Sequence, residues 1–275
     1  FARSTDGGQT WSSPVVLRHT AGGDGATRAV LLDQQTLEDD LGWTGVVYPK
    51  AGGQGYYRWQ VPDEILMRLT SEAGALLSDA ERMDLVGNLS ALLGAGTLDG
   101  GRYLAALEGL AGDPEPLVVG SVLDSLNGVH RAFVPADLED EFAAYIRRAL
   151  RPALDAVGLL PRERESETAT LVRPRLLLWL GDDGRDPEIQ GFAGKQAAAY
   201  LEDPSSVPPS IAGACLSLAA TTGSPEDFEA MKQRFESAET PTERARYLQS
   251  LGAFRDPALV DRALDYAFSG PLRTN

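Results

Sequence analysis

Residues 224–257, SPEDFEAMKQRFESAETPTERARYLQSLGAFRDP, contain the pattern that decides the fold. A residue able to cap a helix stands directly before a proline three times, at Ser224-Pro225, Thr240-Pro241 and Asp256-Pro257, at intervals of 16 residues. Proline suits the first helical position, because its missing N–H would have no partner there. About twelve helical residues, roughly 18 Å long, and a short turn fill each interval. The stretch therefore predicts consecutive helices joined by short turns.

Two such helices form a hairpin of about 32 residues, a length typical of helical solenoid repeats. Both helices supply apolar side chains that must stack on their neighbours. These are Phe228, Met231 and Phe235 on the first helix, and Tyr247, Leu248, Leu251 and Phe254 on or just after the second helix. We therefore expect a curved array of antiparallel helices.

The helical periodicity extends back towards Pro62. Ser78 and Glu81 have the spacing of a capping box, and an apolar stripe follows from Leu85 to Leu93. Most of the further segments are bounded by glycine or by an Asp-Pro step. Helices are expected over residues 78–94, 100–111, 114–127, 135–157, 165–181, 186–202 and 208–221.

Residues 1–61 have a different composition, rich in glycine, valine, threonine and aromatics, which is typical of strands and turns. The aromatic run at residues 56–61 is expected to be a strand that ends at Pro62. Ser4 to Trp11 matches the Asp-box of sialidase-like propellers, but a propeller repeats that motif about every forty to fifty residues and no second copy occurs. We interpret it as a hairpin turn.

The predicted fold is mainly α. A HEAT-like superhelix of antiparallel helix pairs is expected over residues 62–275, preceded by a small β-sandwich segment over residues 1–61.

Composition excludes several functions. The net charge of −15 and the pI near 4.6 oppose nucleic acid or an anionic membrane as a partner. No apolar run approaches the roughly 18 to 20 residues that span a bilayer. The single cysteine, Cys215, excludes an intramolecular disulfide, and the histidines His19 and His130 do not have the spacing of a zinc-hydrolase helix. We expect no metal or other cofactor in this chain.

Four segments carry a resemblance to a known family. They are Gly55-Tyr56-Tyr57-Arg58, Leu77 to Arg82, Ala91 to Leu98, and the arginine-bearing helix from Leu171 to Gly181-Asp182. In this order they resemble the C-terminal region of the zinc aminopeptidases of the aminopeptidase N, puromycin-sensitive and endoplasmic-reticulum type. Asn88 is a departure, since members of that family often carry an aspartate there.

The resemblance implies a parent enzyme that removes N-terminal amino acids from peptides with zinc. Its His-Glu-x-x-His helix would lie upstream of Phe1, where the chain begins without an initiator methionine. The chain would then be an inactive fragment, partnered by the upstream catalytic domain, that closes the active-site chamber and contacts the distal part of the peptide. Its expected location is the cytoplasm. A free-standing helical-repeat scaffold that binds a peptide or protein is the alternative.

Arginines concentrate between residues 147 and 175, where the local charge is +3 although the whole chain is acidic. We predict that Arg147, Arg173 and Arg175 hold a peptide carboxylate by paired hydrogen bonds. The alternative is a solvated helix face with ion pairs between successive turns. The motif of Gly55, Tyr56, Tyr57 and Arg58 is expected to be structural, with Gly55 permitting a backbone conformation closed to other residues.

Overall fold

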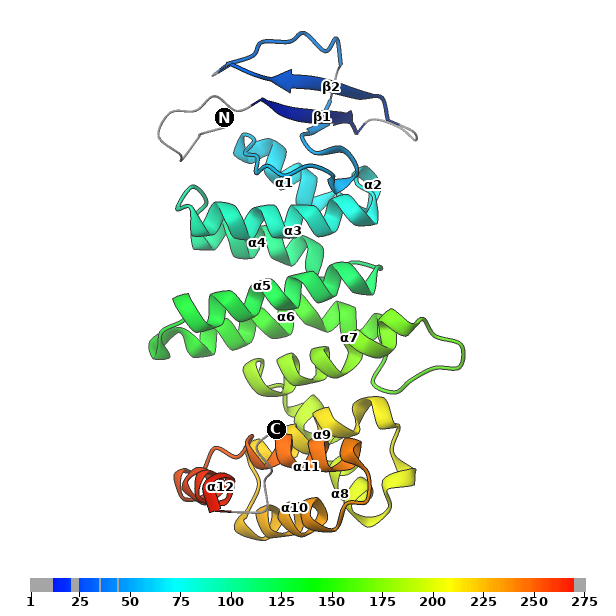
Figure 1. The fold of residues 1–275 in the computed structure, drawn as a ribbon, viewed down its shortest axis with the longest axis vertical. Helices are drawn as coiled ribbons and strands as arrows, with labels where there is room; N and C mark the ends of the chain where they lie inside the picture. The colour runs from blue at the N-terminus through cyan, green and yellow to red at the C-terminus, as the bar shows by residue number, and fades with distance from the viewer. Residues whose placement is uncertain (1–11, 21–24, 35, 44, 270–275) are drawn as a thin grey trace. The chain divides into compact units, whose positions relative to one another are not determined.

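A computed structural model describes residues 12–20, 25–34, 36–43 and 45–269 (Figure 1). The chain divides into two compact units, unit 1 over Phe1–Arg131 and unit 2 over Ala132–Asn275. The Asp-box at residues 4–11 lies outside the described residues. The predicted domain boundary after residue 61 stays a prediction.

Unit 1 begins with a small antiparallel sheet of strands β1 (Ser13–His19), β2 (Thr27–Leu32) and β3 (Val47–Tyr48). β1 is central, with Val15 opposite Val30 on β2 and Arg18 opposite Tyr48 on β3. A short 3₁₀ turn, η1 (Ala51–Gly53), follows. The prediction of a mainly α chain with a small β segment is confirmed, and within the described residues that segment is one three-stranded sheet.

Five helices complete unit 1: α1 (Asp63–Ser71), α2 (Ala73–Leu76), α3 (Asp79–Gly94), α4 (Gly100–Ala111) and α5 (Pro116–Phe133). The capping box of Ser78 and Glu81 starts α3, as predicted. α4 packs on both α1 and α3. Tyr103 of α4 and Leu85 and Leu89 of α3 are almost fully buried there. Two short helices, α1 and α2, were not among the predicted ranges.

The strand expected at residues 56–61 is wrong, since no strand forms there. Its backbone pairs with a side chain instead. The Trp59 N–H donates to Asn88 Oδ1 at 3.0 Å, and Asn88 Nδ2 donates to the Trp59 carbonyl at 2.8 Å. Both bonds are buried, and they attach this segment to α3 in the way that a neighbouring strand would.

Within its described residues, unit 2 contains helices joined by loops and no strand. Its elements are η2 (Ala136–Leu138), α6 (Glu139–Val157), α7 (Glu167–Leu178), a π-helical segment η3 (Trp179–Asp183), α8 (Pro187–Glu202), η4 (Pro204–Ser206), α9 (Pro209–Thr221), α10 (Pro225–Ser237), α11 (Pro241–Leu251) and α12 (Pro257–Ser269). Consecutive helices α8 and α9, and α10 and α11, pack on each other, and α9 also contacts α7 and α11.

The 16-residue pattern is confirmed. Pro225, Pro241 and Pro257 each start a helix. The N-termini of the first two helices have capping boxes, Ser224 with Asp227 and Thr240 with Glu243. The predicted stacking residues are buried except one: Leu248 keeps 40% of its surface exposed.

Candidate functional site

The arginine-rich segment predicted to bind peptide lies in unit 2, on α6, on α7 and in the loop between them. Arg173 stands on α7, and its side chain is completely buried. Its guanidinium forms an ion pair with both carboxylate oxygens of Glu165, with Nη1 2.8 Å from Oε1. It also donates to the carbonyls of Gly158 at 2.9 Å and Val157 at 3.0 Å.

These contacts give Arg173 a clear structural task. The carbonyls of Val157 and Gly158 stand at the C-terminal end of α6, where backbone acceptors lack helical partners. A cation is favourable at that end of a helix. Arg173 therefore fastens the end of α6 and the following loop to α7, and its donors are engaged within the protein.

The carboxylate of Glu165 is held ionised by its surroundings. The hydrogen bond from Arg173 is the largest influence, supported by the backbone N–H of Arg162 at 3.0 Å and the hydroxyl of Thr170 at 2.7 Å. Together they lower the pKa of Glu165 to about 2. The pair is charged across the physiological pH range.

Arg147 lies elsewhere, on α6 opposite the turn that follows η3. Its guanidinium donates to the carbonyl of Gly184. Glycine is required at that turn, because a Cβ on Gly184 would lie 2.6 Å from the carbonyl oxygen of Leu180. Arg185 follows with φ +48°, an uncommon conformation for a residue with a side chain. π-Helical segments and such backbone outliers concentrate at functional sites.

Ion pairs surround this turn within the described residues. Arg185 pairs with Glu139 and Asp140 at the start of α6, at 2.5 and 2.6 Å. Arg151 donates to Glu188 at 2.8 Å and to Asp155 at 2.9 Å. Arg255 pairs with Asp182 from the loop before α12. The turn is thus a concentration of arginines and carboxylates on the surface of unit 2.

The three predicted arginines do not converge on one point. Arg173 joins α7 to the end of α6, and Arg147 contacts the turn after η3. Arg175 is half-buried on α7, and it also has an interaction partner. Their role in holding a peptide stays a prediction. Neither the π-helical segment nor a role for Arg185 in the turn after it was predicted from the sequence. The one local indication was the pair of glycines, Gly181 and Gly184, on either side of Asp182-Asp183.

The Gly55 motif lies in unit 1 beside the sheet. Gly55 has φ +113°, and a Cβ there would lie 2.6 Å from the Tyr57 ring. The Tyr57 hydroxyl donates to the Pro49 carbonyl at 2.8 Å and accepts from the Val16 N–H at 3.4 Å. Tyr56 and Arg58 are exposed. Gly55 and Tyr57 thus have structural contacts.

A buried polar cluster that the sequence did not reveal joins the sheet to α3. Arg18 of β1 donates to Glu81 through Nε at 2.7 Å and Nη2 at 2.6 Å, and the Gly52 N–H adds a bond of 2.9 Å. Burial alone would raise the pKa of Glu81, but these bonds and the one from Ser78 outweigh it and hold that pKa below its usual value. Glu81, which completes the capping box of α3, therefore also holds the sheet through Arg18.

Neither unit offers a metal site within the part of the chain that the structure describes. No group of three or more histidine, cysteine, aspartate or glutamate side chains is arranged to hold an ion there. His19 of β1 instead stacks on Trp43, with ring centroids 5.4 Å apart. Among the described helices, none is long and apolar enough to cross a membrane.

Comparison with known proteins places the fold in a family. Residues 46–275 match the family of the ERAP1-like C-terminal domain. The chain belongs to this family. It is also similar to aminopeptidase 2, mitochondrial, of Saccharomyces cerevisiae, with 20% identity over 253 residues. That alignment covers 90% of this chain and 26% of the yeast protein, so the chain spans about a quarter of the relative's length. The resemblance drawn from the four sequence segments is confirmed.

Proposed function

We propose that this ERAP1-like C-terminal domain is the non-catalytic part of a zinc aminopeptidase that removes N-terminal amino acids from peptides. The observation that carries the proposal is the family match over residues 46–275, joined to a similar relative that is named an aminopeptidase. In this proposal the zinc belongs to a catalytic domain of the parent protein, upstream of this chain, as membership of an aminopeptidase-related family suggests. That domain is the proposed partner of this chain.

The domain's proposed task is to close the chamber over the active site and to contact the distal part of the peptide. The arginines beside η3 support this, because guanidinium groups bind a peptide carboxylate in a bidentate geometry. Arg147 and Arg175 are the candidates for direct contact. Arg173 would act by holding α6 and α7 in place, since its guanidinium is buried. A cytoplasmic location is also proposed, and imaging of the tagged parent protein tests it.

Two measurements test the enzyme assignment. The coding region upstream of Phe1 is expected to encode His-Glu-x-x-His. The purified chain is expected to release no coumarin from an aminoacyl-coumarin substrate, with or without added zinc. If the upstream region lacks that motif, the alternative of a free-standing helical-repeat scaffold replaces the proposal.

A third measurement tests the peptide contact. In the parent enzyme, Arg147→Ala with Arg175→Ala is expected to reduce the preference for long over short peptides while turnover of an aminoacyl-coumarin is retained. Arg68→Ala is the matched control, because Arg68 of α1 lies in the other unit and pairs with Glu72 on the surface at 3.1 Å. An unchanged length preference in the double variant would contradict the arginine contact and leave the enzyme assignment standing.

A further inference from the structure

The helix α12 carries apolar side chains on two faces. One face packs within unit 2: Leu259 is buried, and the Arg262 guanidinium lies 4.7 Å from the centre of the Phe228 ring on α10. The Tyr266 hydroxyl donates to Glu236 at 2.9 Å, and its ring meets Phe235 edge-on. This face accounts for how α12 is attached.

The second face is exposed. Val260, Leu264 and Phe268 follow one another at a spacing of four residues, and 37%, 52% and 89% of their surfaces are accessible. With Ala267, which is also exposed, they cover about 100° of the helix circumference. A stripe of that width is what a helix normally presents to a protein core. A single exposed leucine is normal on a protein surface, but a contiguous apolar stripe along one face of a helix indicates an interaction site.

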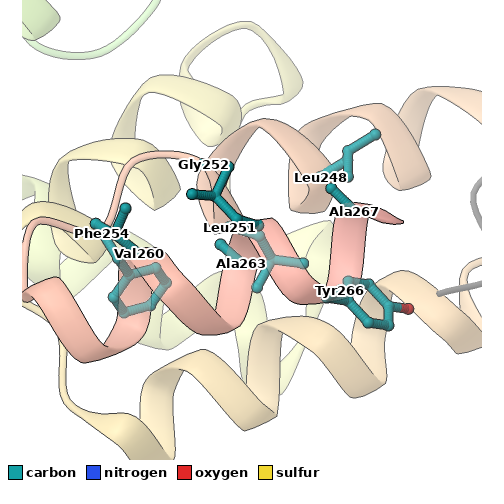
Figure 2. A pocket seen from close by; sticks show the side chains of 9 residues that line it. Leu248, Leu251, Gly252, Phe254, Val260, Ala263, Tyr266 and Ala267 are labelled. Carbon is teal, nitrogen blue, oxygen red and sulfur yellow. The ribbon is translucent and has the colours of Figure 1, made fainter. Parts of the chain in front are cut away.

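A groove of about 210 Å³ adjoins this stripe, between α11 and α12 (Figure 2). Leu248 of α11 opens onto it with 40% of its surface exposed. Ala263 and Ala267 of α12 form the opposite wall, and their small side chains leave the groove open. Two helices with an apolar groove between them provide the surface on which an amphipathic helix packs.

The charges beside the stripe indicate which kind of helix fits. Asp261 and Asp265 are exposed along one edge of the stripe, one turn apart. Among the described residues, neither takes part in a salt bridge. A second copy of this chain, with net charge −15, would bring the same acids against them. Lysine or arginine on the incoming helix would complement them.

We propose that the α11–α12 groove binds an amphipathic helix with Lys or Arg along the edge of its apolar face. The partner continues the pattern already present in unit 2, where neighbouring helices bury each other's apolar faces. This inference depends only on unit 2 and stands apart from the aminopeptidase assignment.

Fluorescence anisotropy of the full chain with a synthetic peptide tests the proposal. The probe is a fluorescein-labelled helix of about four turns, with leucines at helical spacing and lysines along one edge. It is compared with a peptide carrying glutamate in place of lysine and with a scrambled peptide. We expect the lysine peptide to bind about tenfold or more tightly than either.

Leu264→Asp is expected to weaken binding by about tenfold or more, because it places a charge in the apolar contact. The added negative charge would strengthen a merely electrostatic attraction to lysine, so a loss identifies the groove. Leu171→Asp on α7, where the leucine is 62% exposed, is the matched control and should bind like the unaltered chain. Circular dichroism checks that both variants fold.

The proposal is overturned if the lysine peptide does not bind, if Leu264→Asp leaves its binding unchanged, or if the scrambled peptide binds equally well. It is also overturned by a dimer in sedimentation that Leu264→Asp dissociates, because a second copy would then be the occupant.

Discussion

Replacement of Arg173 by methionine should destabilise unit 2 far more than the loss of an ordinary surface ion pair. The guanidinium is fully buried, and the side chain of Glu165 is 12% exposed. Methionine retains much of the side-chain length but none of the donors. It leaves the carboxylate of Glu165 and the carbonyls of Val157 and Gly158 without the partner they now share. Removing one member of a buried ion pair costs about 3–5 kcal/mol.

Urea denaturation of the whole chain measures this cost, and urea is preferred because it does not screen charges. Arg255→Met is the control, since Arg255 and Asp182 are 60% and 31% exposed and such pairs contribute about 0–1 kcal/mol. Glu165→Gln combined with Arg173→Met should cost less than the sum of the single changes, because the pair is removed together. A loss below about 1 kcal/mol for Arg173→Met would refute the structural role.

The same pair predicts a dependence on pH. Hydrogen bonding to Arg173 lowers the pKa of Glu165 from 4.5 to about 2 in the folded chain, so the unfolded chain binds the proton more readily. The stabilisation is complete above about pH 4.5 and is lost as the pH falls towards 2. The difference in unfolding free energy between the unaltered chain and Arg173→Met should therefore shrink across that interval. A constant difference would contradict the assigned cause.

Further substitutions test other parts of the structure. Gly184→Ala should destabilise the chain by about 1–3 kcal/mol in urea, since its Cβ would lie 2.6 Å from the Leu180 carbonyl oxygen; Gly191→Ala, with open space around it in α8, should instead stabilise by about 0.5–1 kcal/mol. Asn88→Asp should cost about 1–3 kcal/mol in the same assay, because a carboxylate accepts from the Trp59 N–H but donates nothing to its carbonyl; an unchanged midpoint would contradict this. Burial raises the pKa of the Cys215 thiol to about 12, so iodoacetamide at pH 8 should label the chain in urea and leave the native chain unlabelled.

The helices could be predicted from the sequence where the residues that start them are neighbours along the chain. The prolines and capping residues before α10, α11 and α12 act within one turn, and the structure places all three starts at the expected residues. The short helix α2 has no such cap. Residues 56–61 misled the prediction because Trp59 obtains its partner from Asn88, 29 residues away. A strand-like composition does not reveal that a side chain takes the place of a neighbouring strand.

The candidate site was less predictable for the same reason. The local excess of arginine is visible in the sequence, but which guanidinium is buried depends on tertiary packing. Arg173 meets the end of α6, whereas Arg147 meets a turn that follows a π-helical segment. Within that segment, a Cβ on Gly181 would lie 2.8 Å from the side chain of Leu218, a close approach that no local pattern encodes.

Reconstitution with the upstream catalytic portion of the parent protein measures the proposed role most directly. Each part is expressed separately, mixed, and assayed for association and for trimming of long peptides. We expect the two parts to associate, and the trimming of long peptides to appear only in the mixture. Peptide cleavage and bound zinc in this chain alone, or no association and no effect on trimming, would contradict the assignment.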